Sequence, residues 1–322
     1  MTFQSNYWGT VCVVLLWYVS NAAIAVTNKA LLSTFDFQKP LLLTLLHMAT
    51  CSALGHLCTR FESNSKSPAT RANIGPTAAL ALIFCASVSF GNVALEFIPV
   101  SFAQAIAAVT PFFTAVLSAA AGKRESVAVY ACLVPIVGGV VASVHYEPCF
   151  NVIGLVAALM ATLLRAGKSV LQEVILADPT SRPSSMCLLR RMATISCIIL
   201  AVPVFVWEGD GIDDMMRLLL NPTSRMLLFA NLLLSYAVNL TQFMVTQRTS
   251  AVSLQVLGNV KGFFTIFVSV AIFHNSVALQ GVLGYTCAVM GAYIYGHLKR
   301  AGGTNTVDVK KTGIRQHSNS HV

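Results

Sequence analysis

Apolar runs of membrane-spanning length recur along almost the whole chain and restrict its fold more than any other feature. A helix of about 20 residues crosses the ~30 Å hydrocarbon core of a bilayer, whereas a barrel strand needs only about ten. Charged residues make up 10% of the chain, against about 25% in soluble domains. The sequence therefore predicts an all-α integral membrane protein with ten transmembrane helices, at 8–32, 40–59, 74–94, 101–121, 127–144, 152–176, 185–207, 226–246, 252–273 and 278–297.

These spans fill residues 1–298, which we predict to be one domain, and leave 299–322 as a polar, basic tail. The tail has the composition of a disordered segment. No basic region precedes the first apolar run and no convincing cleavage site follows it, so we expect a retained span rather than a signal peptide. An Arg- and Ser-rich transit peptide also has no room before this span.

Basic residues are distributed unevenly between the two sides of the predicted membrane. With a cytosolic N-terminus, 14 of the 21 basic residues fall on the cytosolic side and three (Lys39, Arg217 and Arg225) on the other. Loops rich in Lys and Arg stay in the cytosol, so both termini are predicted to be cytosolic. The net charge of +9 then reflects topology and does not indicate nucleic-acid binding.

Two spans align when the sequence is shifted by 151 residues. "SFAQAIAAVTPFFTAVLS" (101–118) then matches "VSLQVLGNVKGFFTIFVS" (252–269), with Gln104 on Gln255 and Thr114 on Thr265. These are the fourth and ninth spans, and an odd interval means that they cross the membrane in opposite directions. The sequence thus predicts two inverted five-helix repeats, roughly 1–148 and 149–298, which are typical of secondary transporters with a midplane site.

Four cations fall inside predicted spans, where each costs roughly 2.5–3.5 kcal/mol by insertion scales. They are Lys29, Arg165, Lys168 and Lys261. Arg165 and Lys168 share a helix face at i,i+3, with Glu173 as the one plausible internal partner, while Lys29 can extend to the interface. Lys261 lies mid-span without a nearby acid and pairs with Thr110 in the repeat. A transient, highly charged anion such as a phosphate would neutralise this positive field.

Neutral polar side chains accompany the cations in the spans. A stripe of Tyr236, Asn239 and Gln242 suits a nucleobase or sugar, although interhelical hydrogen bonding is the alternative for each such residue. No motif for nucleotide hydrolysis, metal binding or a nucleophilic triad is present, and the nine cysteines form no CxxC. We therefore expect no enzyme, no cofactor and no metal. The remaining candidate site residues are His47, Gln104, Thr110, Gln255 and Asn259.

The chain resembles the triose-phosphate translocator family of the drug/metabolite transporter superfamily along nearly its full length. The resemblance is carried by "SNAAIAVTNKALL", "LLLTLLHMATCSAL", "FGNVALEFIPVSFAQAIAAVTPFFTAV", "LLRAGKSVLQ", "YAVNLTQFMVTQRTSAVSLQVLGNVKG" and "GYTCAVMGAYIYG". Such proteins are ten-helix antiporters of phosphorylated solutes. In the plastid branch the ninth-helix lysine is followed by arginine, and a histidine ends "SFTH". Here Gly262 follows Lys261 and Gln104 replaces the histidine, which resembles the group carrying nucleotide sugars, including UDP-arabinofuranose, into the Golgi.

The resemblance implies an antiporter that exchanges a nucleotide sugar, a UDP-sugar first, for nucleoside monophosphate across a Golgi or ER membrane. Lys261 would be the main phosphate contact, supported by Arg165 and Lys168, with Tyr236 and Asn239 at the uridine or sugar. The alternatives are a plastid sugar-phosphate or phosphoenolpyruvate/phosphate exchanger and a non-transporting membrane protein whose cations are satisfied internally. Homodimerisation stays open.

Overall fold

The structure is a computed structural model, and it describes residues 2–62, 74–123, 151–178 and 183–260, with isolated residues at 127–138 and at 294. In these residues the chain forms helices and no strand, as predicted. The helices are α1 (Thr2–Lys29) with a π-helical turn (Ala30–Thr34), α2 (Pro40–Glu62), α3 (Ile74–Phe97), α4 (Val100–Ala107), α5 (Thr110–Ala120), α7 (Val152–Ala177), α8 (Ser185–Trp207), α9 (Gly211–Leu220), α10 (Pro222–Arg248) and a final helix, Ala251–Val260.

Seven helical segments are long and apolar enough to cross a membrane, which supports a multi-pass membrane protein. They correspond to the predicted first to fourth and sixth to eighth spans. The predicted fifth and tenth spans, and the ninth beyond residue 260, lie outside the described residues. Large apolar side chains such as Phe205, 82% exposed, project outward, as expected of surfaces that face lipid. The count of ten helices stays a prediction.

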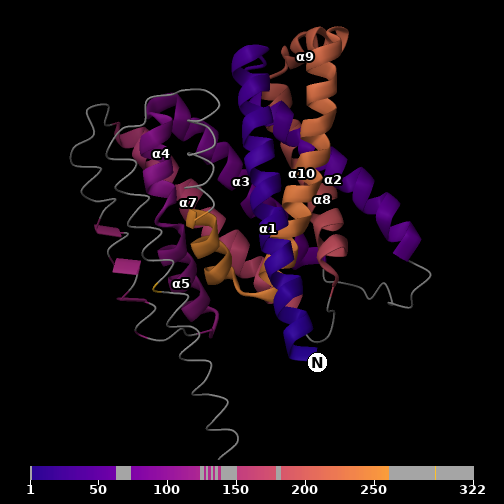
Figure 1. The fold of residues 1–322 in the computed structure, drawn as a ribbon. Coiled ribbons are helices and arrows are strands. Elements are labelled where there is room, and N and C mark those ends of the chain that lie inside the picture. Colours follow the sequence, from indigo (N-terminus) through magenta and orange to yellow (C-terminus); the bar gives the residue numbers. More distant parts are fainter. Residues whose placement is uncertain are drawn as a thin grey trace, which may run out of the picture.

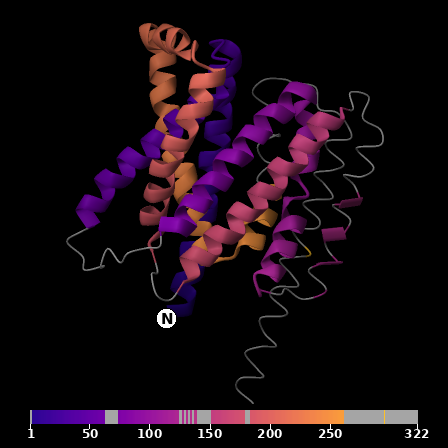
Figure 2. The same cartoon turned by 180° about the vertical axis from the view of Figure 1, so that it is seen from behind.

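The helices pack in pairs along their lengths. Figure 2 shows α3 and α7 side by side, and contacts are also extensive between α1 and α10 and between α2 and α8. Glycines allow two of these close approaches. A Cβ on Gly55 of α2 would lie 2.9 Å from the Cβ of Arg190, and a Cβ on Gly154 of α7 would lie 2.5 Å from the Cγ2 of Ile98.

One end of the bundle carries α9 and the other carries the N-terminus (Figure 1); we call them the α9 end and the N-terminal end. Residues 208–225 were read from the sequence as a loop, so α9 was not predicted. Its Leu218 is buried against Leu31 and Phe37, while Asp213 and Asp214 occupy its first turn. It is a short amphipathic helix that covers the ends of the longer ones.

Charged groups at the α9 end attach the start of α2 to the turn before α9. The Glu208 carboxylate accepts hydrogen bonds from the backbone N–H groups of Leu41 (3.0 Å) and Leu42 (2.7 Å). Lys39 Nζ donates to Asp210 Oδ1 at 2.6 Å. This contact raises the pKa of Lys39 and lowers the pKa of Asp210.

The predicted fourth span is interrupted between α4 and α5. Pro111 has no N–H to donate to the Ala107 carbonyl, and the Thr110 hydroxyl donates there instead. The next amide, that of Phe112, bonds Val109 O at 2.9 Å. Ala108 O instead accepts from Asn259 Nδ2 at 3.0 Å. Side chains thus satisfy two carbonyls that the interruption frees, as required inside a membrane.

Candidate functional site

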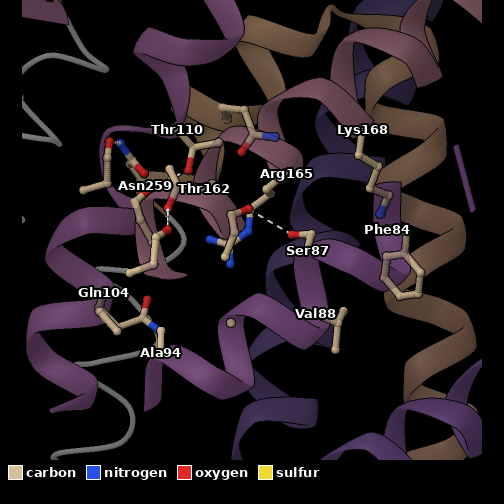
Figure 3. A pocket seen from close by; sticks show the side chains of 18 of the residues that line it. Phe84, Ser87, Val88, Ala94, Gln104, Thr110, Thr162, Arg165, Lys168 and Asn259 are labelled. Carbon is tan, nitrogen blue, oxygen red and sulfur yellow. Dashed lines mark hydrogen bonds between the residues drawn. The ribbon is translucent and has the colours of Figure 1, made fainter. Parts of the chain in front are cut away.

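A cavity of about 510 Å³ lies between α1, α3, α4, α7, α10 and the final helix, beside the interruption at Thr110 (Figure 3). This volume is in the range of small-molecule sites, roughly 300–1,000 Å³. On α3 the lining runs from Phe84 to Leu95, and on α7 from Ala158 to Lys168. Its polar lining residues are Ser87, Asn92, Gln104, Thr110, Thr162, Arg165, Lys168, Gln242, Gln255 and Asn259.

The two cations of α7 both line this cavity. In Figure 3 the Arg165 side chain lies in the middle of the cavity, and Lys168 points toward Phe84. Lys168 is only 6% exposed, and its Nζ lies 4.9 Å from the ring centroid of Phe84 and 5.9 Å from that of Phe243. A cation–π contact contributes about 0.5–2 kcal/mol, which is less than the roughly 2.5–3.5 kcal/mol cost of an ion at this depth.

No carboxylate lies within ion-pair distance of Lys168 among the described residues; the ion pairs of Lys39, Lys123 and Arg217 lie elsewhere. Glu173, the partner considered from the sequence, instead receives Lys123 Nζ on Oε1 at 3.0 Å. Its Oε2 accepts from the backbone N–H of Ala251 at 2.8 Å. Lys168 therefore lies in a cavity that supplies positive charge and aromatic faces but, in this part of the chain, no counterion.

Four of the neutral candidates also line the cavity: Gln104, Thr110, Gln255 and Asn259. Gln255 Nε2 donates to Ser169 Oγ at 2.5 Å, and Asn259 makes the bond to Ala108 described above. These contacts join the final helix to α7 and to the α4–α5 interruption. With Arg165 and Lys168, six of the eleven candidate site residues therefore meet in one cavity, and they come from three segments distant in sequence.

The other described candidates lie outside the lining. His47 Nε2 and Asn231 Oδ1 are 2.6 Å apart, and Asn231 Nδ2 donates to Thr27 (2.8 Å) and Asn28 (2.6 Å) in a network between α1, α2 and α10. Asn239 and Tyr236 of α10 do not line the cavity: Asn239 donates to the carbonyl of Ser235 in its own helix, and Tyr236 packs on the core. Lys29 is the last residue of α1 and does not line the cavity either. Lys261 lies outside the described residues.

Asn92 was not selected from the sequence as a site residue. It lines the cavity, and its Nδ2 is buried without a hydrogen-bond partner among the described residues. Trp17, Ser87 and Thr162 are further lining residues that were not selected, and Gln242, named from the sequence only as part of the stripe with Tyr236 and Asn239, lines the cavity as well. Asn92 and Gln242 carried a detectable signal, an amide in an apolar span, whereas the others resemble ordinary packing residues.

Comparison with known proteins assigns the chain to a family. The model of the Triose-phosphate Transporter family matches residues 9–296. A probable sugar phosphate/phosphate translocator of Arabidopsis thaliana is 41% identical over 296 residues, 90% of this chain and 96% of the relative. UDP-uronic acid transporter 1 of the same plant is 38% identical over 291 residues, 89% of this chain and 94% of the relative.

A solved crystal structure shares the fold, with a TM-score of 0.66 over 92% of this chain and 99% of its own at 17% identity. The family model spans most of the 322 residues, and the relatives are matched over nearly their whole length. The chain therefore belongs to the triose-phosphate transporter family, whose members are transporters and not enzymes.

Proposed function

We propose that this protein exchanges a nucleotide sugar, in the first instance a UDP-sugar, for a nucleoside monophosphate. One observation carries the proposal: Lys168 is buried in a cavity of about 510 Å³ beside Arg165, with no carboxylate in ion-pair distance of it among the described residues. A phosphate group supplies the missing negative charge, and it binds both an ammonium and a planar guanidinium. The similarity to a UDP-uronic acid transporter supports a nucleotide-linked substrate.

The candidate residues predicted from the sequence have different roles in this proposal. Lys168 and Arg165 hold the phosphates together with Lys261, which follows the lining residues Leu254 and Gly258 by seven and three positions, the spacing of one helix face. Gln104, Thr110 and Gln255 offer neutral donors and acceptors to sugar and base. His47, Tyr236, Asn239 and Lys29 maintain the helix packing around the cavity in the conformation described, since none of them lines it.

We further propose that ten helices form two inverted repeats, roughly 1–148 and 149–298. The packing supports this, because α1 lies against α10 as α7 lies against α3. Asn259 also contacts Ala108, and these positions differ by the repeat spacing of 151 residues. Equivalent positions of two repeats touch only where they meet the pseudo-two-fold axis. The cavity beside this contact is where inverted-repeat transporters bind substrate.

Exchange, rather than one-way transport, follows from the electrostatics. A carrier whose buried cations lack an anion reorients unfavourably, since the ions stay in a low-dielectric site during the movement. Either the nucleotide sugar or the monophosphate neutralises them, so the loaded forms interconvert. The proposal places the protein in a Golgi or ER membrane, with its N-terminal end toward the cytosol.

A sugar phosphate is the second candidate substrate, because a relative at 41% identity is named a probable sugar phosphate/phosphate translocator. Its single phosphate would also bind Arg165 and Lys168. A sugar phosphate has no nucleobase, so the neutral polar side chains of the cavity would make fewer contacts with it than with a nucleotide sugar. The plastid envelope would then be the expected membrane.

A substrate panel in proteoliposomes separates the candidates. Purified protein is loaded with UMP, GMP or inorganic phosphate, and uptake of labelled UDP-sugars, GDP-sugars and triose phosphate is measured. We expect fast uptake of a UDP-sugar against internal UMP and little uptake into empty liposomes. Lys261→Ala should abolish exchange, and Lys39→Ala, which removes a lysine distant from the cavity, should preserve it. Equal uptake into empty and loaded liposomes would overturn the exchange mechanism.

A further inference from the structure

Polar contacts close the N-terminal end of the bundle directly beneath the cavity. The lining on α7 ends at Lys168, and the next turns bond across to other segments. Gln172 Nε2 donates to Thr246 Oγ1 at 2.8 Å, and Ser169 receives the bond from Gln255. The cavity therefore extends from this closed floor toward the α9 end, where α3 ends and α7 begins.

Glu173 makes a charged connection in this floor. Its two oxygens bind separate partners, Lys123 after α5 and the backbone N–H of Ala251, the first residue of the final helix. A carboxylate at a helix N-terminus is stabilised by the free N–H groups and the helix dipole. Glu173 thus connects α7, the end of α5 and the final helix.

Among the described residues, no side-chain hydrogen bond is found at the corresponding helix start at the α9 end. The repeat spacing of 151 residues places Val100, the first residue of α4, opposite Ala251. The residue before it, Pro99, makes no side-chain capping hydrogen bond. The two equivalent helix starts therefore differ within the described residues: the one at the N-terminal end is bonded to a side chain of α7, and the one at the α9 end has no corresponding bond to α1.

Packing contacts also identify the α1 residue that corresponds to Glu173. A Cβ on Gly9 would meet the Nη1 atom of Arg248, a Cβ on Gly154 would meet Ile98 Cγ2 and Phe97 Cβ, and Phe97 and Arg248 are themselves 151 apart. α1 and α7 are thus related by a shift of 145, which takes Glu173 to Asn28. A packed cluster supports both shifts. The shift of 145 takes Val13 and Trp17 of one cluster to Ala158 and Thr162, and the shift of 151 takes Val245 and Leu254 of the same cluster to Ala94 and Ala103, which lie together beside α7.

We propose that Glu173 and Asn28 are alternating gate residues. In the conformation described, Glu173 caps the final helix and holds the N-terminal end closed, while Asn28 Oδ1 accepts from Asn231. When the carrier reorients, Glu173 releases Ala251 and Lys123, and Asn28 leaves Asn231 to cap Val100 and close the α9 end. The inference rests on the proposed alternating transport, and it identifies the side chains that exchange partners.

The two gates differ in strength. A hydrogen bond to a charged group stabilises more than one between neutral groups. The closure by Glu173 is therefore stronger than the closure by Asn28, and the empty carrier should favour the conformation described. Substituting each residue should move this equilibrium in opposite directions.

Accessibility of the cavity from each side tests the proposal. Ala107 lines the cavity, so Ala107→Cys serves as a reporter in a protein whose nine native cysteines are replaced. Labelling by a membrane-impermeant thiol reagent is measured in sealed vesicles of known orientation. Glu173→Ala should increase labelling from the N-terminal side by about 10-fold or more, because it removes a charged hydrogen bond from one state only. Asn28→Ala should decrease it, and Asp214→Ala, which breaks an ion pair within α9, should leave it unchanged.

A cross-link provides a second test that does not depend on destabilising the fold. In the same background, Lys123→Cys with Glu173→Cys is treated with a short, reducible bifunctional reagent. Exchange should stop on cross-linking and return on reduction to the level of the untreated double variant, while reduction should change neither single variant treated with the same reagent. Unchanged accessibility in Glu173→Ala, or full exchange by the cross-linked protein, overturns the gate proposal. Failure of wild-type protein to exchange any nucleotide, with accessibility responding as described, instead overturns the proposed substrate and leaves the gate.

Discussion

Replacing Lys168 by methionine should weaken substrate binding without weakening the fold. Methionine is nearly as long and can still pack beside Phe84 and Phe243, whose rings face the Lys168 ammonium, but it removes the charge. The empty protein loses a cation–π contact of about 0.5–2 kcal/mol. It also no longer bears the roughly 2.5–3.5 kcal/mol cost of an ion at this depth. The balance favours equal or higher thermal stability for Lys168→Met.

The substrate complex responds in the opposite sense. A hydrogen bond to a charged group contributes about 1.5–3 kcal/mol, so its loss should reduce affinity for a UDP-sugar by about 10- to 150-fold. Equilibrium binding of labelled substrate and thermal unfolding are measured on the same purified preparations. Lys168→Arg keeps the charge and should lie between the wild type and Lys168→Met in affinity, while Lys39→Met, outside the cavity, should bind normally.

The two measurements together separate a binding residue from a structural one. If Lys168→Met unfolds at a clearly lower temperature and its affinity is unchanged, Lys168 supports the fold and the reasoning fails. Unchanged affinity with unchanged stability refutes it equally, since the buried charge would then serve neither purpose.

Three further predictions concern the fold. Gly154→Ala should destabilise the protein by about 1–3 kcal/mol through overpacking, because its Cβ would lie 2.5 Å from Ile98 Cγ2; Gly75→Ala, with nothing within 4 Å, should not. Asn231→Leu should lower the melting temperature, since each buried polar group that it strands costs about 1–3 kcal/mol; a normal melting curve would show that the network with His47 is dispensable. Asp210→Asn should lower the melting temperature near neutral pH. Because Lys39 lowers the pKa of Asp210, its contribution is present above the ordinary carboxyl value of 3.8 and disappears as pH falls through the lowered pKa; a difference that persists at still lower pH would contradict this origin.

The spans could be predicted because a bilayer imposes a length on every apolar helix. α9 was missed because ten residues are too few to span, so its amphipathic pattern was absorbed into a loop. The interruption at Pro111 was also not predicted. It depends on Asn259, a distant residue that satisfies the carbonyl of Ala108, and such pairings are set by tertiary structure.

The lining of the candidate site could be predicted only in part, for a related reason. A buried cation is costly wherever it lies, so the composition of one span was enough to select Arg165 and Lys168. A neutral amide or imidazole is equally at home in a cavity and between helices. Gln255 reaches the cavity, whereas His47 bonds Asn231 and Asn239 bonds its own helix. Sequence spacing does not distinguish these cases.

Competition between UMP and uridine for labelled UDP-sugar on the purified carrier tests the central claim most directly. The two compounds share base and ribose and differ in the phosphate. If the buried cations exist to bind a phosphorylated solute, UMP should displace the label at concentrations at least about 10-fold below uridine, given the 1.5–3 kcal/mol of a hydrogen bond to a charged group. Equal displacement by both, or no binding of any phosphorylated compound, would contradict the claim.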